Sequence, residues 1–137
     1  MGNKYVIVLT ACINPGKMIH TSLTDVDIRR RQYEDALEFY LLQTDYPIVF
    51  VENSGTDISG DFRKFVDCGR LEFVTFQGNE EFDRKKGKGY GEALILEYAL
   101  EHSLFVHQCD FLVKITGRLK VLNIKRLIAV RKMFGDN

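Results

Sequence analysis

Four short apolar runs, separated by longer mixed segments, give the chain a repeating pattern. Residues 4–13, 48–51, 71–76 and 110–119 are rich in β-branched, aromatic and leucine side chains. Residues 5–9 are apolar without alternation, which is typical of a strand covered on both faces in a parallel sheet. We therefore predict one strand in each of these four ranges.

The segments between the runs have helical spacing. In residues 25–43, Tyr33, Leu37, Tyr40 and Leu41 lie on one stripe, as expected for a core-facing helix. Further helices are expected over 60–68, 91–107 and 124–134. Strands that alternate with helices predict an α/β fold, here a three-layer, Rossmann-like, mostly parallel sheet. The length suits one domain over residues 1–137.

Composition narrows the classes of function. The chain has 19 Lys and Arg and 19 Asp and Glu, and this neutral balance argues against a dedicated nucleic-acid binder. Cys12, Cys68 and Cys109 match no zinc or redox spacing, which favours a reducing, cytoplasmic compartment. No apolar run reaches the roughly 20 residues of a membrane span. We therefore expect no nucleic-acid partner and no transmembrane segment.

A glycine-rich basic loop leads into the most apolar predicted helix. Residues 86–92 read Lys-Gly-Lys-Gly-Tyr-Gly-Glu. Glycines let the backbone turn tightly, and the first turn of a helix offers free N–H donors. Arg84, Lys85, Lys86 and Lys88 add positive charge nearby, so the pattern indicates an anion site, for phosphate above all. The alternative is a solvated charged loop before a core helix.

The fourth predicted strand carries charge within an apolar run. Lys114, Thr116 and Arg118 alternate along it, so a regular strand would place them on one face. Two cations and a hydroxyl there would suit the phosphates or carboxylate of a ligand. The alternatives are a strand at the edge of the sheet, or a pairing of Lys114 with a carboxylate such as Glu97.

No metal site is expected. Asp25 and Asp27 form a D-x-D pattern, but they begin a helix, where the helix dipole accounts for acidic residues. The three histidines have no metal-ligand spacing.

The last predicted helix combines basic and apolar residues. Lys125, Arg126, Arg131 and Lys132 stand beside Leu127 and other apolar residues. This pattern fits a membrane surface or an acidic partner. It equally fits the solvated outer face of an ordinary packed helix.

Four motifs occur in order along the chain: residues 8–15 (VLTACINP), 51–55 (VENSG), 86–92 and 113–119 (VKITGRL). Together they resemble the N-terminal part of bacterial GT-A-type glycosyltransferases of capsule and lipopolysaccharide biosynthesis. The resemblance covers nearly the whole chain and implies a nucleotide-sugar-binding α/β domain. In that reading the loops after the first two strands face the nucleotide, and residues 88–92 lie near the diphosphate or the sugar.

The donor site is expected to include Thr10, Ala11, Asn14, Asn53, Ser54, Lys88, Gly89, Glu92, Lys114, Thr116 and Arg118. Ligands in open parallel sheets bind beyond the carboxyl ends of the strands, where most of these residues are expected. We expect the protein in the cytoplasm, peripheral to the inner face of the membrane. A homo-oligomer is one alternative for its assembly state.

The chain departs from the family in two respects. GT-A enzymes commonly place an acidic D-x-D at the end of the fourth strand, where it holds a divalent ion. Residues 114–118 read Lys-Ile-Thr-Gly-Arg instead. Lys114 and Arg118 would neutralise the leaving phosphates without a metal, so no cofactor and no divalent metal are expected. The family also usually continues well beyond this length, so we expect a chain that is truncated relative to the family and that lacks catalytic elements.

The first hypothesis is therefore a glycosyltransferase, or its donor-binding half, that transfers a sugar from a nucleotide-sugar donor to a saccharide acceptor of a surface polysaccharide. Glu52, Asp57 and Asp110 are the candidate bases. One alternative is a sugar nucleotidyltransferase, although that class carries a glycine-rich basic loop directly after the first strand. The other alternative is a noncatalytic module that binds a nucleotide or dimerises.

Overall fold

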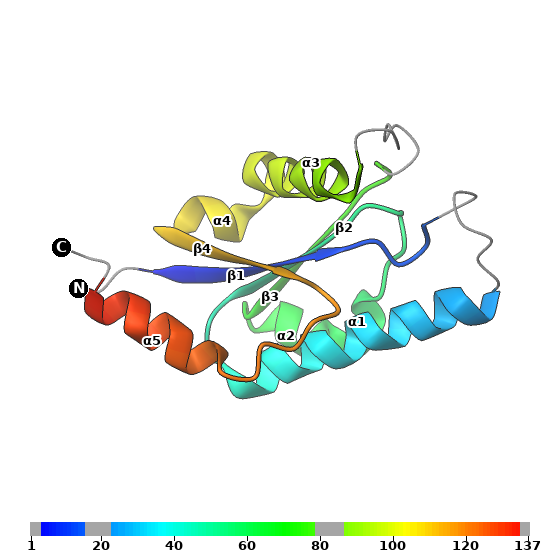
Figure 1. Cartoon of the computed structure of the whole chain (residues 1–137). Coiled ribbons are helices and arrows are strands. Elements are labelled where there is room, and N and C mark those ends of the chain that lie inside the picture. Colours follow the sequence, from blue (N-terminus) through cyan, green and yellow to red (C-terminus); the bar gives the residue numbers. More distant parts are fainter. Residues whose placement is uncertain (1–3, 16–22, 79–86, 135–137) are drawn as a thin grey trace.

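The computed structural model describes residues 4–15, 23–78 and 87–134 (Figure 1). Four strands alternate with helices, so the predicted α/β fold is confirmed. In chain order the elements are β1 (Tyr5–Ala11), α1 (Leu23–Gln43), β2 (Ile48–Glu52), a 3-10 turn η2 (Ser59–Phe62), α2 (Arg63–Asp67), β3 (Leu71–Thr75), α3 (Gly87–His102), α4 (Leu104–Gln108), β4 (Phe111–Thr116) and α5 (Ile124–Phe134).

The four strands form one parallel sheet in the order β3-β2-β1-β4. All seven residues of β1 are buried, which explains why its apolar run does not alternate. From β1 the chain moves outward through β2 to β3 and then returns to place β4 on the other side of β1. The strand order therefore switches direction between β1 and β4.

Helices cover both faces of the sheet and give it three layers. On one face, side chains of α1 and α5, such as Leu37, Tyr40 and Ile128, pack with Ile7 and Phe50. On the other face, Ile95 and Ala99 of α3 pack on valines of β1 and β2, and α4 adds partly buried residues. None of the described helices has the length and apolarity needed to cross a membrane.

Most boundaries lie within three residues of the sequence prediction, and two differences bear on the site. β4 ends at Thr116 rather than Leu119, because the chain turns there: Gly117 N–H donates to Thr10 O at 2.8 Å, and Leu119 N–H donates to Thr116 O at 3.0 Å. The single helix predicted over 91–107 begins earlier, at Gly87, and is interrupted at Ser103. The Ser103 hydroxyl accepts from Val106 N–H and caps the start of α4.

Candidate functional site at the carboxyl edge of the sheet

The switch in strand order places the candidate site at the carboxyl ends of β1 and β4. The strand register pairs Thr10 with Thr116 and Val8 with Lys114. The carboxyl ends of the strands and the start of α3 lie at the same end of the molecule (Figure 1). Ligands of open parallel sheets bind at such a switch point, so this edge is the candidate functional site.

Glu92 of α3 joins two of the predicted site residues. Lys114 Nζ donates to Glu92 Oε2 at 2.8 Å, and the Thr116 hydroxyl donates to Glu92 Oε1 at 3.0 Å. Partial burial raises the pKa of the Glu92 carboxyl, but these hydrogen bonds and the charge of Lys114 outweigh burial and leave that pKa below its usual value. The partner of Lys114 is thus Glu92, whereas Glu97, the carboxylate named from the sequence, is exposed.

Arg118 lies on the other side of the sheet from Lys114. Its Nη1 donates to Gln32 Oε1 at 3.3 Å, and its guanidinium carbon lies 5.8 Å from the centre of the Tyr33 ring. Gln32 and Tyr33 belong to α1, whereas Lys114 faces α3. The prediction that Lys114 and Arg118 share one face is therefore wrong, because the regular strand ends at Thr116 and the turn at Gly117 redirects the chain.

Two residues of α1 complete this side of the edge, and the sequence reasoning missed both as site residues. Cys12 N–H donates to the Tyr33 hydroxyl at 3.0 Å, and Arg29 Nε donates to Ile13 O at 3.2 Å. Burial raises the pKa of the Tyr33 phenol, and the bond from Cys12 and the charges of Arg29 and Arg118 offset only part of this shift. The sequence offers no pattern that distinguishes Arg29 from the neighbouring Arg30 and Arg31. The spacing of Tyr33 predicts a core residue, so nothing in the sequence marks it as a site residue.

Glu52, a candidate base, is a fully buried carboxylate at the end of β2. Its oxygens accept hydrogen bonds from the N–H groups of Ile13 at 2.7 Å, Ser54 at 2.8 Å and Thr56 at 2.9 Å, and from the Ser54 hydroxyl. Asn14 N–H in turn donates to Ser54 Oγ at 3.1 Å. Glu52 therefore joins the loops that follow β1 and β2 and fixes their relative position.

The other two candidate bases lie elsewhere. Asp57 is exposed, and hydrogen bonds from Ser59 lower the pKa of its carboxyl, which makes it a weaker base. Asp110 precedes β4 and accepts from Lys4 N–H at 2.8 Å, so it lies at the amino edge of the sheet. The candidate bases are thus not brought together, and Asp110 does not join the carboxyl-edge site.

Two buried polar atoms at the carboxyl edge have no hydrogen-bond partner within the described part of the chain. Thr10 is 2% exposed and Asn53 is 9% exposed, and the atoms are Thr10 Oγ1 and Asn53 Oδ1. A buried polar atom without a partner costs about 1–3 kcal/mol, and such a group in a folded protein calls for an explanation. Thr10 lies next to Thr116 in the register, so its hydroxyl borders the Glu92 network.

The remaining predicted residues take these positions. Ala11 closes β1, while Asn14 and Ser54 lie in the loops tied together by Glu52. Lys88 and Gly89 fall in the first turn of α3, and the side chain of Lys88 lies outside the described residues, as does the basic segment 84–86. Among the residues that the structure describes, no group of three or more His, Cys, Asp and Glu side chains could hold a metal ion.

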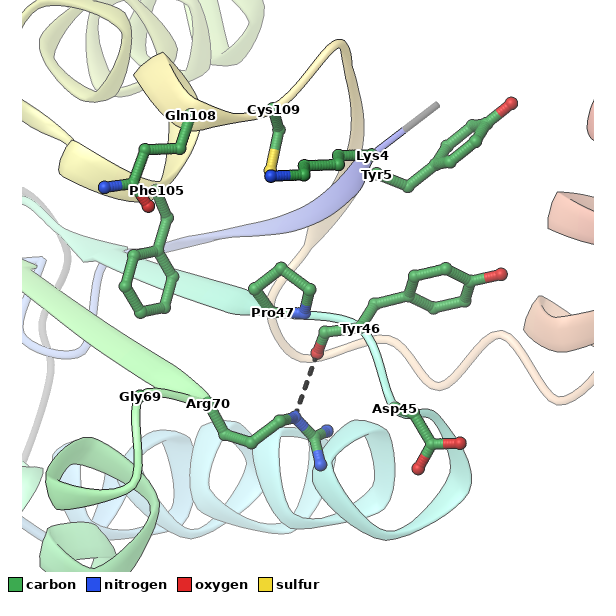
Figure 2. A pocket seen from close by; sticks show the side chains of 10 residues that line it. All are labelled: Lys4, Tyr5, Asp45, Tyr46, Pro47, Gly69, Arg70, Phe105, Gln108 and Cys109. Atoms are coloured by element: carbon green, nitrogen blue, oxygen red, sulfur yellow. Dashed lines mark hydrogen bonds between the residues drawn. The ribbon is translucent and has the colours of Figure 1, made fainter. Parts of the chain in front are cut away.

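A cavity of about 460 Å³ opens at the opposite, amino edge of the sheet (Figure 2). Arg70 borders it, and its guanidinium donates to Tyr46 O at 3.1 Å, Leu41 O at 3.2 Å and Thr44 O at 2.8 Å. These carbonyls belong to the end of α1 and the loop after it, so Arg70 caps that helix. The buried atoms Thr10 Oγ1 and Asn53 Oδ1, which have no partner in the described part of the chain, lie at the carboxyl edge, and we place the candidate site there.

Comparison with protein-family models, with curated proteins and with solved structures gives no match for this chain. The resemblance to GT-A-type glycosyltransferases therefore stays a prediction that rests on its four motifs.

Proposed function

We propose that the carboxyl edge of the sheet binds a nucleotide-sugar, and that the chain is a glycosyltransferase or its donor-binding part. The observation that carries the proposal is a pair of buried atoms at the carboxyl edge, Thr10 Oγ1 and Asn53 Oδ1, that have no hydrogen-bond partner among the described residues. A threonine hydroxyl can donate or accept, and an amide oxygen can accept. Ribose hydroxyls and base N–H groups offer the complementary partners.

The proposed reaction is attack by an acceptor hydroxyl on the anomeric carbon of the donor. The new C–O bond forms as the bond to the nucleotide's phosphate breaks, and the hydroxyl proton passes to a base. Lys114 is hydrogen-bonded to the same carboxylate, Glu92, as Thr116. It uses one N–H for Glu92, and an ammonium group carries three, so two donors remain for the leaving phosphate.

The setting of this reaction also belongs to the proposal. The acceptor would be a saccharide of a surface polysaccharide, and the protein would act in the cytoplasm at the inner face of the membrane. No divalent metal is invoked, because cationic side chains supply the same electrostatic stabilisation of a leaving phosphate.

The test is a calorimetric titration of the protein with UDP, CMP, GDP and TDP and their sugar conjugates, with and without Mn²⁺. We expect saturable binding of one nucleotide series, unaffected by Mn²⁺ and weakened about fivefold by Thr10→Val, since one lost hydrogen bond is worth about 1 kcal/mol. Equal affinity of the wild type and of Asn53→Leu and Thr10→Val would contradict the site. Binding that requires Mn²⁺ would contradict the metal-free mechanism.

A noncatalytic nucleotide-binding module is the second candidate. It is favoured because two of the candidate bases are poorly placed to take a proton from an acceptor. Glu52 is buried and accepts four hydrogen bonds, and Asp110 lies at the opposite edge of the sheet. Incubation with the nucleotide-sugar that binds separates the two candidates. Release of free nucleotide above the uncatalysed rate supports the enzyme, whereas binding without release supports the module.

A further inference from the structure

The charges of the chain are divided unevenly along its length. Residues 111–135 contain seven Lys and Arg and no Asp or Glu, within a chain whose formal net charge is zero. The remaining residues therefore carry a net charge of −7. Such an asymmetry indicates an interaction with an acidic surface.

Within this segment, exposed leucines and exposed cations alternate closely along the chain. Leu119 is 60% exposed, Leu122 82% and Leu127 50%. Lys120, Lys125 and Arg126 are exposed between them, and none of the three has a carboxylate within salt-bridge distance among the described residues. We call these six residues the basic leucine face.

The backbone of this segment is fixed so that these side chains point outward. Ile124 and Ile128 are buried in the core cluster that α1 shares. The Tyr40 hydroxyl of α1 donates to Leu119 O and accepts from Val121 N–H at 2.8 Å. The segment runs from β4 into α5 on the same side of the sheet as α1 (Figure 1). The leucines therefore cannot turn inward without breaking these contacts.

We propose that the basic leucine face docks onto an anionic lipid surface. Leucines that enter the headgroup boundary, flanked by cations that reach the phosphates, are the pattern of interfacial binding. A nucleic acid would use the cations but leave three leucines in water. A protein partner is disfavoured because protein interfaces concentrate aromatic anchors, and the basic leucine face contains none.

The expected strength follows from charge and apolar contact. A Lys or Arg near an anionic surface changes the affinity about fivefold, so removal of three should weaken binding about 100-fold. The attraction is screened within a distance of about 10 Å at 0.1 M salt. Binding should therefore fall steeply as salt is added.

The test is vesicle flotation of the full chain with phosphatidylcholine vesicles and with vesicles of phosphatidylcholine and phosphatidylglycerol. One variant carries Lys120→Gln, Lys125→Gln and Arg126→Gln, and its control carries Arg31→Gln, Arg63→Gln and Lys64→Gln at exposed positions elsewhere. A second variant replaces the three leucines of the basic leucine face with serine. Its control replaces the exposed Leu42, Leu100 and Leu104 with serine. Thermal unfolding checks that every variant is folded, and an RNA oligonucleotide serves as the competing polyanion.

We expect salt-sensitive flotation with the anionic vesicles alone, lost in both variants of the face and kept in both controls. Failure to float with anionic vesicles, or equal loss in the controls, overturns the proposal. RNA binding that persists in the leucine variant without any flotation overturns it in favour of a nucleic acid. Lipid docking deepens the membrane setting given under the proposed function. None of these results depends on nucleotide binding at the carboxyl edge, so a failure of lipid docking and a failure of the nucleotide site can be told apart.

Discussion

The hydroxyl of Thr10 provides the sharpest test of the candidate site, because its replacement is expected to stabilise the protein. Thr10 is 2% exposed, and its Oγ1 has no partner in the described part of the chain. Valine has nearly the same shape and carries a methyl group in place of the hydroxyl. Thr10→Val therefore removes an unpaired buried polar group without opening a cavity.

The size of the effect follows from the cost of leaving that hydroxyl without a partner. This cost is about 1–3 kcal/mol, of which we expect about 1–2 kcal/mol to be recovered as free energy of unfolding. For a chain of 137 residues, each kcal/mol corresponds to a melting-temperature change of about 3–4 °C. Urea unfolding followed by circular dichroism, together with a thermal melt, measures both quantities.

Thr44 is the matched control. It is also 2% exposed, but its hydroxyl donates to Tyr40 O at 2.8 Å. Thr44→Val removes a satisfied hydrogen bond and should lower the free energy of unfolding by about 1 kcal/mol. The two substitutions should therefore act in opposite directions. If Thr10→Val destabilises the protein as Thr44→Val does, the Thr10 hydroxyl is not left unpaired and the reasoning is refuted.

Three further predictions concern the framework around the site. Glu52→Gln should destabilise by about 2–4 kcal/mol in urea unfolding, because an amide NH2 cannot accept the backbone N–H bonds that the buried carboxylate accepts. Gly117→Ala should destabilise by about 1–3 kcal/mol in the same assay, because the added Cβ would lie 2.7 Å from Thr10 O. Despite partial burial, hydrogen bonds from Lys114 and Thr116 hold the pKa of the folded-state Glu92 carboxyl below its ordinary value. Its contribution to stability should therefore be present at neutral pH and be lost as the pH falls below the ordinary pKa of a glutamate, and Glu92→Gln should flatten that part of the stability profile.

Each of these predictions has a contradicting result. A fully stable Glu52→Gln protein would show that the loops after β1 and β2 do not depend on the carboxylate. An unchanged free energy of unfolding in Gly117→Ala would contradict the close approach of the turn after β4 to the end of β1. A Glu92→Gln variant with the acid sensitivity of the wild type would show that other carboxylates govern this pH range.

The layer architecture could be predicted from the sequence because the spacing of apolar residues indicates which face of each strand or helix is buried. The continuous run 5–9 predicted a strand covered on both faces, and β1 is buried throughout. The stripe on residues 33–41 predicted the buried face of α1. Both predictions depend only on the spacing of apolar residues along the chain, which can be read from a single sequence.

The pairings at the site could not be predicted in the same way. Alternation placed Lys114, Thr116 and Arg118 on one face, but the turn at Gly117 depends on a hydrogen bond to Thr10, over a hundred residues earlier in the chain. The choice of Glu92 over Glu97 depends on how far α3 reaches over the edge. The roles of Arg29 and Tyr33 depend on where α1 crosses the end of β1.

The central claim is that the carboxyl edge binds a nucleotide through Thr10 and Asn53. The most direct test is a calorimetric titration of the wild type, Thr10→Val and Thr44→Val proteins with the nucleotide that gives the strongest signal. We predict saturable binding to the wild type and to Thr44→Val, and about fivefold weaker binding to Thr10→Val, despite its greater expected stability. Equal binding by all three proteins, or binding by none, would contradict the account.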